Sequence, residues 1–162
     1  MVVSASPPIL TSSTTHACAI ALGQWGLLIT GPSGSGKSAL AAHLVECWQS
    51  QNLHARWISD DRVCITSAHQ KLIARCPATI NGMAEIGQLG IVRVDHQSSG
   101  IIDAVVKLVA QSELERMPEQ RVGCISSAVP ISLPTLHVPQ REIAVSAQMI
   151  SHWLKLGFFQ ED

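Results

Sequence analysis

The stretch that decides this fold is Gly31-Pro32-Ser33-Gly34-Ser35-Gly36-Lys37-Ser38, which matches the phosphate-binding loop G-x-x-x-x-G-K-[ST] at every defined position. Its glycines let consecutive backbone N–H groups turn inward around a phosphate, and the positive end of the following helix points at the same place. We expect Lys37 to reach the β- and γ-phosphates of ATP, and the Ser38 hydroxyl to take one coordination position on Mg²⁺. The candidate nucleotide-binding residues are Gly31, Ser33, Gly34, Ser35, Gly36, Lys37 and Ser38.

The sequence on either side of this loop supports the same interpretation. Residues 26–30 are typical of a buried strand that runs into the loop, and residues 39–48 predict a helix with one apolar face. Residues 16–22 predict an earlier strand, and the turn at residues 23–26 makes a hairpin of the two. Strand, loop and helix therefore follow one another in the order that a phosphate-binding loop requires.

Strands outnumber helices in the rest of the chain. Apolar runs predict strands at residues 55–58, 62–66, 71–75, 91–94 and 101–109, and residues 130–139 are extended because of their prolines. Residues 141–156 predict a C-terminal helix with Gly157 as its cap. We therefore expect an α/β fold with a strand-rich mixed sheet, a helix after the phosphate loop and a second helix at the C-terminus.

The bulk composition limits the range of functions. The chain has 162 residues, a net charge of −1 and no apolar run near the ~18 residues of a membrane span, which favours neither nucleic acid nor a membrane as partner. Its 5 cysteines form no C-x-x-C pair and indicate reduced thiols in the cytoplasm. We expect one catalytic domain over residues 16–162, with residues 1–15 as a flexible tail.

Carboxylates after a predicted strand are candidates for catalysis and for metal binding. Asp60 and Asp61 follow residues 55–58 and should lie at the same sheet end as the phosphate loop. Glu85 lies among glycines that let a backbone approach a ligand, although a surface glutamate is the ordinary alternative. His16 lies on the strand before the loop. Arg121, with Arg116, borders the polar residues 111–120, which we expect to be mobile.

Taken together, these residues resemble the catalytic domain of the HPr kinase/phosphorylase family. The resemblance is carried by His16 and the phosphate loop at matching spacing, by Ser59-Asp60-Asp61-Arg62-Val63, by Glu85 with Leu89-Gly90-Ile91, and by Leu114-Glu115-Arg116 with Arg121-Val122-Gly123. It spans roughly residues 16–157. The resemblance implies a short form of the family without the separate N-terminal domain, and the fold type that HPr kinase shares with phosphoenolpyruvate carboxykinase.

The resemblance implies an activity and a role for each candidate residue. Such enzymes use ATP to phosphorylate a serine of HPr, a small carrier protein of the sugar phosphotransferase system, and use inorganic phosphate to remove it again as pyrophosphate. Asp60 would accept the serine proton, supported by His16, and Arg121 would steady the transferred charge. Ser38, Glu85 and Asp61 would serve Mg²⁺. Family members also suggest a homo-oligomer, a hexamer.

Two departures from the family pattern keep alternatives open. The arginine-glycine pair that usually follows the acidic position is Gly87-Gln88 here, and the mobile loop is a few residues short. The dephosphorylation reaction is therefore open, as is a non-catalytic ATP sensor on the same fold. A small-molecule kinase is a third possibility, since guanylate kinases share the loop string. A transporter ATPase would need a Leu-Ser-Gly-Gly-Gln signature, which this chain does not have.

Overall fold

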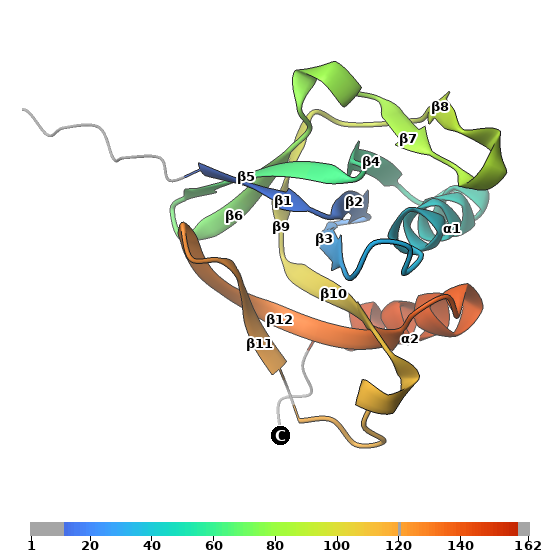
Figure 1. Ribbon diagram of the computed structural model, residues 1–162, viewed down its shortest axis with the longest axis vertical. Helices are drawn as coiled ribbons and strands as arrows, with labels where there is room; N and C mark the ends of the chain where they lie inside the picture. Colours follow the sequence, from blue (N-terminus) through green and yellow to red (C-terminus); the bar gives the residue numbers. More distant parts are fainter. Residues whose placement is uncertain (1–11, 120, 159–162) are drawn as a thin grey trace, which may run out of the picture.

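The hairpin that precedes the Gly31–Ser38 loop lies in the middle of a six-stranded mixed sheet (Figure 1). This computed structural model describes residues 12–119 and 121–158. β2 (Cys18–Leu22) and β3 (Trp25–Thr30) pair antiparallel, as the turn between them predicts. The sheet order is β11-β12-β10-β3-β2-β4. The mixed, strand-rich α/β fold expected from the sequence is therefore confirmed.

This sheet contains both parallel and antiparallel pairs. β10 (Ala104–Val109) runs parallel to β3 and to β12 (Val129–Pro139), so the carboxyl ends of these three strands meet at one edge. β4 (Ala55–Ser59) is antiparallel to β2, and β11 (Arg121–Ser126) is antiparallel to β12. The Gly31–Ser38 loop leaves the sheet at the edge where the parallel strands end.

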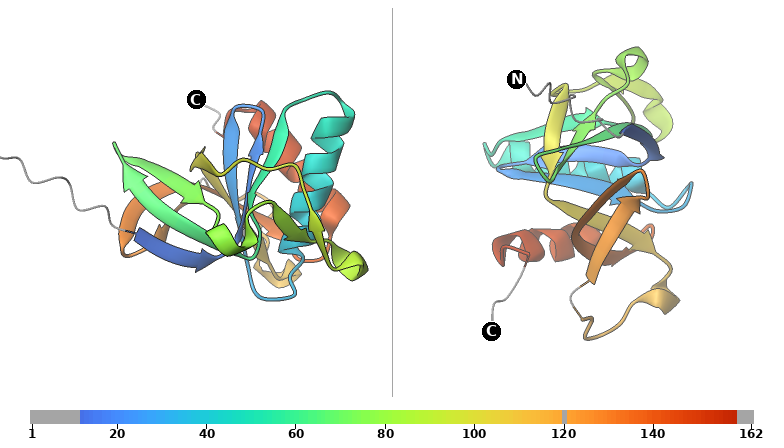
Figure 2. Two further views of the ribbon diagram at one scale, coloured as in Figure 1. Left: turned by 90° about the horizontal axis from the view of Figure 1, so that it is seen from above. Right: turned by 90° about the vertical axis from the view of Figure 1, so that its left-hand side faces the viewer.

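Two helices cover one face of this sheet and a second sheet covers part of the other. α1 (Lys37–Ser50) and α2 (Ile143–Lys155) pack against alternate residues of the central strands, such as Leu27 and Ile29. Leu28, between them, faces the opposite way into a second core. Figure 2 shows β2 and β3 between α1 on one side and the second sheet on the other. Because both faces are buried, these strands read as continuous apolar runs rather than alternating ones.

The second sheet has four antiparallel strands in the order β1-β5-β6-β9. They are β1 (Ser12–His16), β5 (Arg62–Ala68), β6 (Lys71–Arg75) and β9 (Ser99–Ile102). β1 pairs with β5 along its whole length. The expectation of a flexible tail over residues 1–15 is therefore wrong for residues 12–15, which belong to this strand. The rest of the expected tail, residues 1–11, lies outside the described residues.

The aliphatic run at residues 101–109 is two strands rather than the single strand expected. The chain leaves the second sheet after Ile102 and enters the six-stranded sheet at Ala104. Between them, Asp103 accepts a 2.8 Å hydrogen bond from Gly26 N through its carboxylate. A Cβ at Gly26 would lie 1.8 Å from the Ile101 carbonyl oxygen, so only glycine allows this crossing.

The remaining elements are short and follow the glycine-rich and polar segments. A two-stranded ribbon, β7 (Met83–Glu85) and β8 (Ile91–Arg93), lies above α1 in Figure 1. Three 3-10 turns complete the structure: η1 (Ala78–Ile80), η2 (Gly87–Leu89) and η3 (Gln111–Glu113). Residues 121–123, expected to border a mobile loop, form the start of β11. Among the described residues, no helix is long and apolar enough to cross a membrane.

Candidate active site

The Gly31–Ser38 loop is a tight turn whose shape depends on glycine. Gly36, the residue before α1, has φ 100° and ψ 21°, a left-handed conformation that strains any side-chain-bearing residue. Lys37 is buried, and its Nζ donates to the carbonyl oxygens of Gly31 and Pro32, each at 3.0 Å. The first turn of α1 contains no acidic residue. The loop therefore presents a cation and a helix N-terminus, and the first turn of the helix adds no carboxylate of its own.

The Asp60 carboxylate accepts hydrogen bonds from several elements behind this loop. Its Oδ1 accepts from the Ser38 hydroxyl at 2.7 Å and from the Cys18 thiol at 2.9 Å. Its Oδ2 accepts from the Glu85 backbone N–H at 2.9 Å. Asp60 is buried, with 5% of its surface exposed. The carboxylate is held by three donors from separate elements, so its orientation is fixed before any ligand arrives.

Cys18 is a member of this cluster that the sequence analysis did not single out. Burial raises the pKa of its thiol far above the ordinary value, and the neighbouring Asp60 charge raises it further. The thiol therefore stays protonated and acts as a hydrogen-bond donor rather than a nucleophile. No sequence motif includes this residue. Its position two residues after His16, on a strand beside the loop, is the one feature of the sequence that could have indicated a place in the site.

His16 and Asp61 form a second pair, on the exposed side of the same corner. His16 Nδ1 lies 3.0 Å from Asp61 Oδ1, and the two side chains are 53% and 72% exposed. The backbone also joins these segments, because Ala17 N donates to the Asp61 carbonyl oxygen at 3.2 Å. Asp61 has φ 63°, a left-handed backbone conformation, and its carboxylate contacts His16 whereas that of Asp60 contacts Ser38. The two adjacent aspartates thus have different environments.

Oxygen ligands for a metal ion are available at Asp60, Ser38 and the neighbouring Glu85. Hydroxyl and carboxylate oxygens suit Mg²⁺, which keeps several waters and needs few protein ligands. The Glu85 side chain is exposed, and only its backbone contacts Asp60. Within residues 12–119 and 121–158, no group of three His, Cys, Asp or Glu side chains could hold a metal by itself. The donor set fits an ion shared with nucleotide phosphates.

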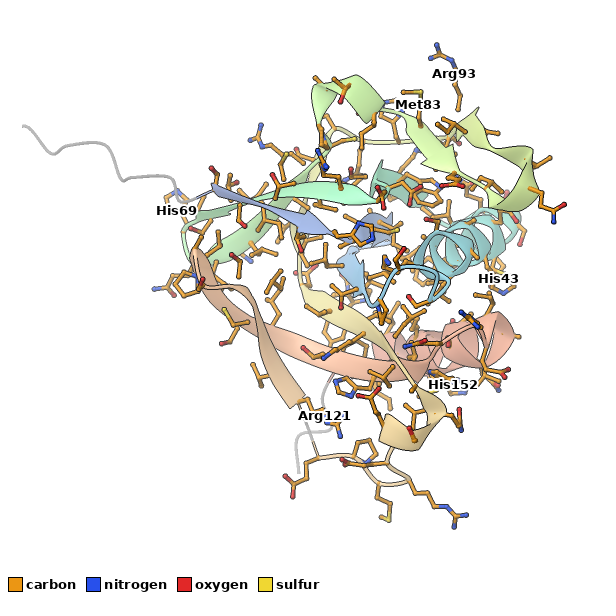
Figure 3. The ribbon with its side chains drawn as sticks, in the orientation of Figure 1. His43, His69, Met83, Arg93, Arg121 and His152 are labelled. Atoms are coloured by element: carbon orange, nitrogen blue, oxygen red, sulfur yellow. The ribbon has the colours of Figure 1, made fainter. Side chains whose placement is uncertain are left out.

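Arg121, labelled in Figure 3, lies at the start of β11, at the opposite edge of the six-stranded sheet from β4, the strand that leads to Asp60. Its guanidinium forms a 2.7 Å ion pair with Glu115 and contacts the ring of His137. Arg121 and His16 line the same cavity of about 630 Å³. In Figure 3, His43 and His152 lie on the helices and His69 at the turn between β5 and β6, and none of the three lines this cavity.

Arg141 is a further residue beside the loop that the sequence did not reveal. Its backbone N–H donates to the Ser35 carbonyl oxygen at 3.1 Å, and its Nε donates to the Gly34 carbonyl oxygen at 3.2 Å. Arg141 has φ 62° and lies just before α2. The start of α2 is therefore tied to the loop, a tertiary contact that no local pattern encodes.

The fold and the site together define a class of protein. It is a strand-rich α/β domain with a phosphate-loop sequence between a central strand and the first helix. An aspartate hydrogen-bonds to the last serine of that loop. The family model described as the HPr serine kinase C-terminal domain matches residues 9–151 of the chain. The chain therefore belongs to the HPr serine kinase C-terminal domain family, as its resemblance to these enzymes predicted.

Individual relatives agree with this membership. The HPr kinase/phosphorylase of Clostridium tetani is 31% identical over 131 residues, which cover 74% of this chain and 41% of that protein. The HPr kinase/phosphorylase of Lactiplantibacillus plantarum is 41% identical over 70 residues, covering 43% of this chain and 20% of the relative. The chain thus spans well under two thirds of the length of these relatives.

A solved structure shares the fold. The Hpr(Ser) kinase/phosphatase from Coxiella burnetii superposes with a TM-score of 0.71 over 90% of this chain and 93% of the other, at 21% identity. At that identity the likeness establishes the architecture alone.

Proposed function

We propose that this chain transfers the γ-phosphate of ATP to a serine of an HPr-like carrier protein, with Mg²⁺ as cofactor. One observation carries the proposal: Ser38 of the phosphate-loop sequence donates to Asp60 at 2.7 Å, while the next residue, Asp61, pairs with His16 at 3.0 Å. Phosphoryl transfer needs a phosphate loop, a carboxylate in fixed position near the metal ion and a group that accepts the proton of the attacking hydroxyl. Asp60 and Asp61 suit the last two roles.

The two aspartates divide the work between them. Asp60 is buried and already bound by Ser38, so it suits the metal side of the site, directly or through water. Asp61 is exposed and oriented by His16, so it suits the side from which a protein serine approaches. This assignment exchanges the roles expected from the sequence, where Asp60 was the proton acceptor. Burial and hydrogen-bond partners are the reason for the exchange.

The transfer then follows simple steps. The serine proton passes to the Asp61 carboxylate as the serine oxygen attacks the γ-phosphorus. The bond from that phosphorus to the bridging oxygen breaks, and ADP leaves. Lys37 and the loop N–H groups stabilise the charge on the phosphates; bound Mg²⁺ would supply further neutralisation there. The Lys37 contacts with Gly31 and Pro32 are replaced by phosphate contacts in this scheme.

The reverse reaction would use the same residues. Inorganic phosphate would take the position of the γ-phosphate and attack the phosphoserine, giving pyrophosphate, with Asp61 returning the proton to the serine. Gly87-Gln88, which replaces the arginine-glycine pair usual in the family, lies in η2, just after the strand that carries Glu85. Because of this replacement near the site, we propose the reverse reaction only as a secondary activity.

The test is direct transfer to the carrier. The purified chain is mixed with ATP, Mg²⁺ and HPr, and the intact mass of HPr is followed over time. A gain of one phosphate group, dependent on ATP and mapped to a serine, supports the proposal. ATP binding without any phosphorylation of HPr would instead favour the sensor function.

A further inference from the structure

A row of polar side chains crosses three neighbouring strands on the sheet face opposite the helices. Thr30 of β3 lies directly opposite Lys107 of β10, and Lys107 lies directly opposite His137 of β12. Directly paired residues point to the same face of a sheet. The flanking residues Val106 and Val138 point the other way, into the core beneath the helices. The row therefore lies outside the helix-covered core, at the strand ends next to the Gly31–Ser38 loop.

Arg121 brings a third nitrogen-bearing side chain to this row. It pairs with Thr135, two residues before His137 and on the same face, and its guanidinium contacts the His137 ring. Lys107, Arg121 and His137 line one cavity of about 630 Å³ together with Thr30, Thr135 and His16. Thr15 also lines it, so the cavity is edged by two cations, two imidazoles and three hydroxyls.

The charges around the cavity are unbalanced. Arg121 is partly offset by Glu115. Lys107 is exposed and has no hydrogen bond or ion pair among the described residues. The pKa of His137 is lowered, first by burial and then by Arg121 and Lys107, while Glu113 and Glu115 oppose the shift. An anion bound between Lys107, Arg121 and His137 would offset the repulsion that lowers this pKa.

We propose that this cavity is a second anion site, distinct from the Gly31–Ser38 loop, which binds a phosphate dianion through Lys107, Arg121 and His137. Guanidinium and imidazole N–H groups with a lysine ammonium are the donors that phosphate recognition uses. The same chemistry suits two sources, inorganic phosphate or the phosphoserine of a partner protein. The cavity exceeds the size of one anion, so a phosphorylated side chain fits as well. The site stands whether or not the chain transfers phosphate.

The first test separates this site from the loop. Sulfate is the probe because its charge is constant between pH 5.5 and 8, and Lys37→Ala provides a background with a weakened loop. Sulfate at about five times its Kd should raise Tm by about 2–4 °C in this background, relative to chloride at equal ionic strength. Adding Lys107→Ala should remove that rise, whereas adding the matched exposed-lysine control Lys71→Ala should preserve it.

The comparison between variants decides the result, because sulfate also stabilises proteins in general. Equal Tm shifts with and without Lys107→Ala would overturn the proposal. No shift beyond that general effect in the Lys37→Ala background would also overturn it, since the loop would then be the one strong anion site. Lys107 is exposed, so its replacement should leave the Tm without sulfate nearly unchanged.

Two further measurements test the chemistry. In a His16→Gln background, where His137 is the remaining imidazole of the cavity, the sulfate effect should grow as the pH falls from 8 to 5.5, because the anion favours protonation of His137. The effect should become independent of pH once His137→Gln is added. Parallel titrations with inorganic phosphate and with a phosphoseryl peptide identify the source, which is the ligand whose affinity falls about tenfold or more in Lys107→Ala. Unchanged affinity for both ligands in Lys107→Ala would contradict the proposal.

Discussion

The Ser38 hydroxyl donates a 2.7 Å hydrogen bond to Oδ1 of Asp60, a residue 22 positions further along the chain. This bond joins the first turn of α1 to the end of β4. The Cys18 thiol donates to the same oxygen from β2. Three elements therefore meet at one carboxylate oxygen, where a metal ion would replace or share the hydroxyl contact.

Ser38→Ala and Asp60→Asn should both raise the Mg²⁺ concentration needed for half-maximal activity, by about tenfold or more. Each removes an oxygen that suits a hard cation, and the asparagine also removes a charge. The check is a Mg²⁺ titration of phosphoryl transfer at saturating ATP. Ser50→Ala is the matched control, because Ser50 lies at the other end of α1 and its hydroxyl donates to the Cys47 carbonyl oxygen of the same helix. A Mg²⁺ curve that is unchanged in both site variants would rule out this metal position.

Lys37→Ala should weaken ATP binding and abolish transfer, because it removes the ammonium group that faces the phosphates. Binding is measured by titration with a fluorescent ATP analogue and transfer by the mass of HPr. Lys71→Ala, an exposed lysine on β6, should behave as wild type. Normal turnover in Lys37→Ala would exclude the Gly31–Ser38 loop as the nucleotide site.

Local patterns predicted the central part of the fold well. The β2–β3 hairpin, α1 and the α2 end at Gly157 follow from apolar periodicity and from glycine positions, which depend on neighbouring residues alone. The break at Asp103 did not follow, because the switch between sheets depends on Gly26, far away in the sequence. The division of 101–109 into β9 and β10 is thus a tertiary effect.

The site was predicted in its composition but not in its arrangement. Asp60 and Asp61 were identified by their position after a strand, whereas their partners depend on the fold. Only the structure shows that Asp60 points inward to Ser38 and that Asp61 turns outward to His16. Lys107 left one trace in the sequence, as the single charge within an aliphatic strand, but its pairing with His137 required the register.

Cys18 should resist alkylation in the folded protein while Cys124 reacts. The Cys18 thiol is buried and its pKa is raised by burial and by Asp60, so the reactive thiolate is scarce. Cys124 is exposed and serves as the internal control. Brief treatment with iodoacetamide at pH 8, followed by peptide mass analysis, measures both. Equal labelling of the two thiols would contradict the buried, proton-donating role.

The same thiol should make stability fall at high pH. Its folded pKa lies above the ordinary value of 9.0, so unfolding favours loss of the proton once the pH exceeds that value. The stabilising contribution is complete below pH 9 and decreases as the pH rises further. The free energy of unfolding of wild type should therefore fall more steeply above pH 9 than that of Cys18→Val. Parallel curves for the two proteins would show that the thiol is not shifted.

Residues 114–119 should order when ligand binds. The segment between η3 and β11 is largely exposed and forms no strand, although Glu115 holds Arg121. Its amide hydrogens should exchange quickly in the free protein and more slowly with ATP, Mg²⁺ and HPr present. Amides of β12 serve as the control and should change little. Identical exchange in the segment with and without these ligands would contradict an ordering role.

The rate of serine phosphorylation of HPr by Asp61→Asn, at saturating ATP and Mg²⁺, tests the central claim most directly. Asparagine keeps the size of the side chain and loses its basicity, so the account predicts near-normal ATP affinity and a rate lower by about 10²–10⁴-fold. His16→Gln should lower the rate in the same direction, while Asp95→Asn, an exposed aspartate paired with Arg56, should leave it unchanged. If Asp61→Asn phosphorylates HPr at the wild-type rate, the His16–Asp61 pair is not the proton acceptor and the account is contradicted.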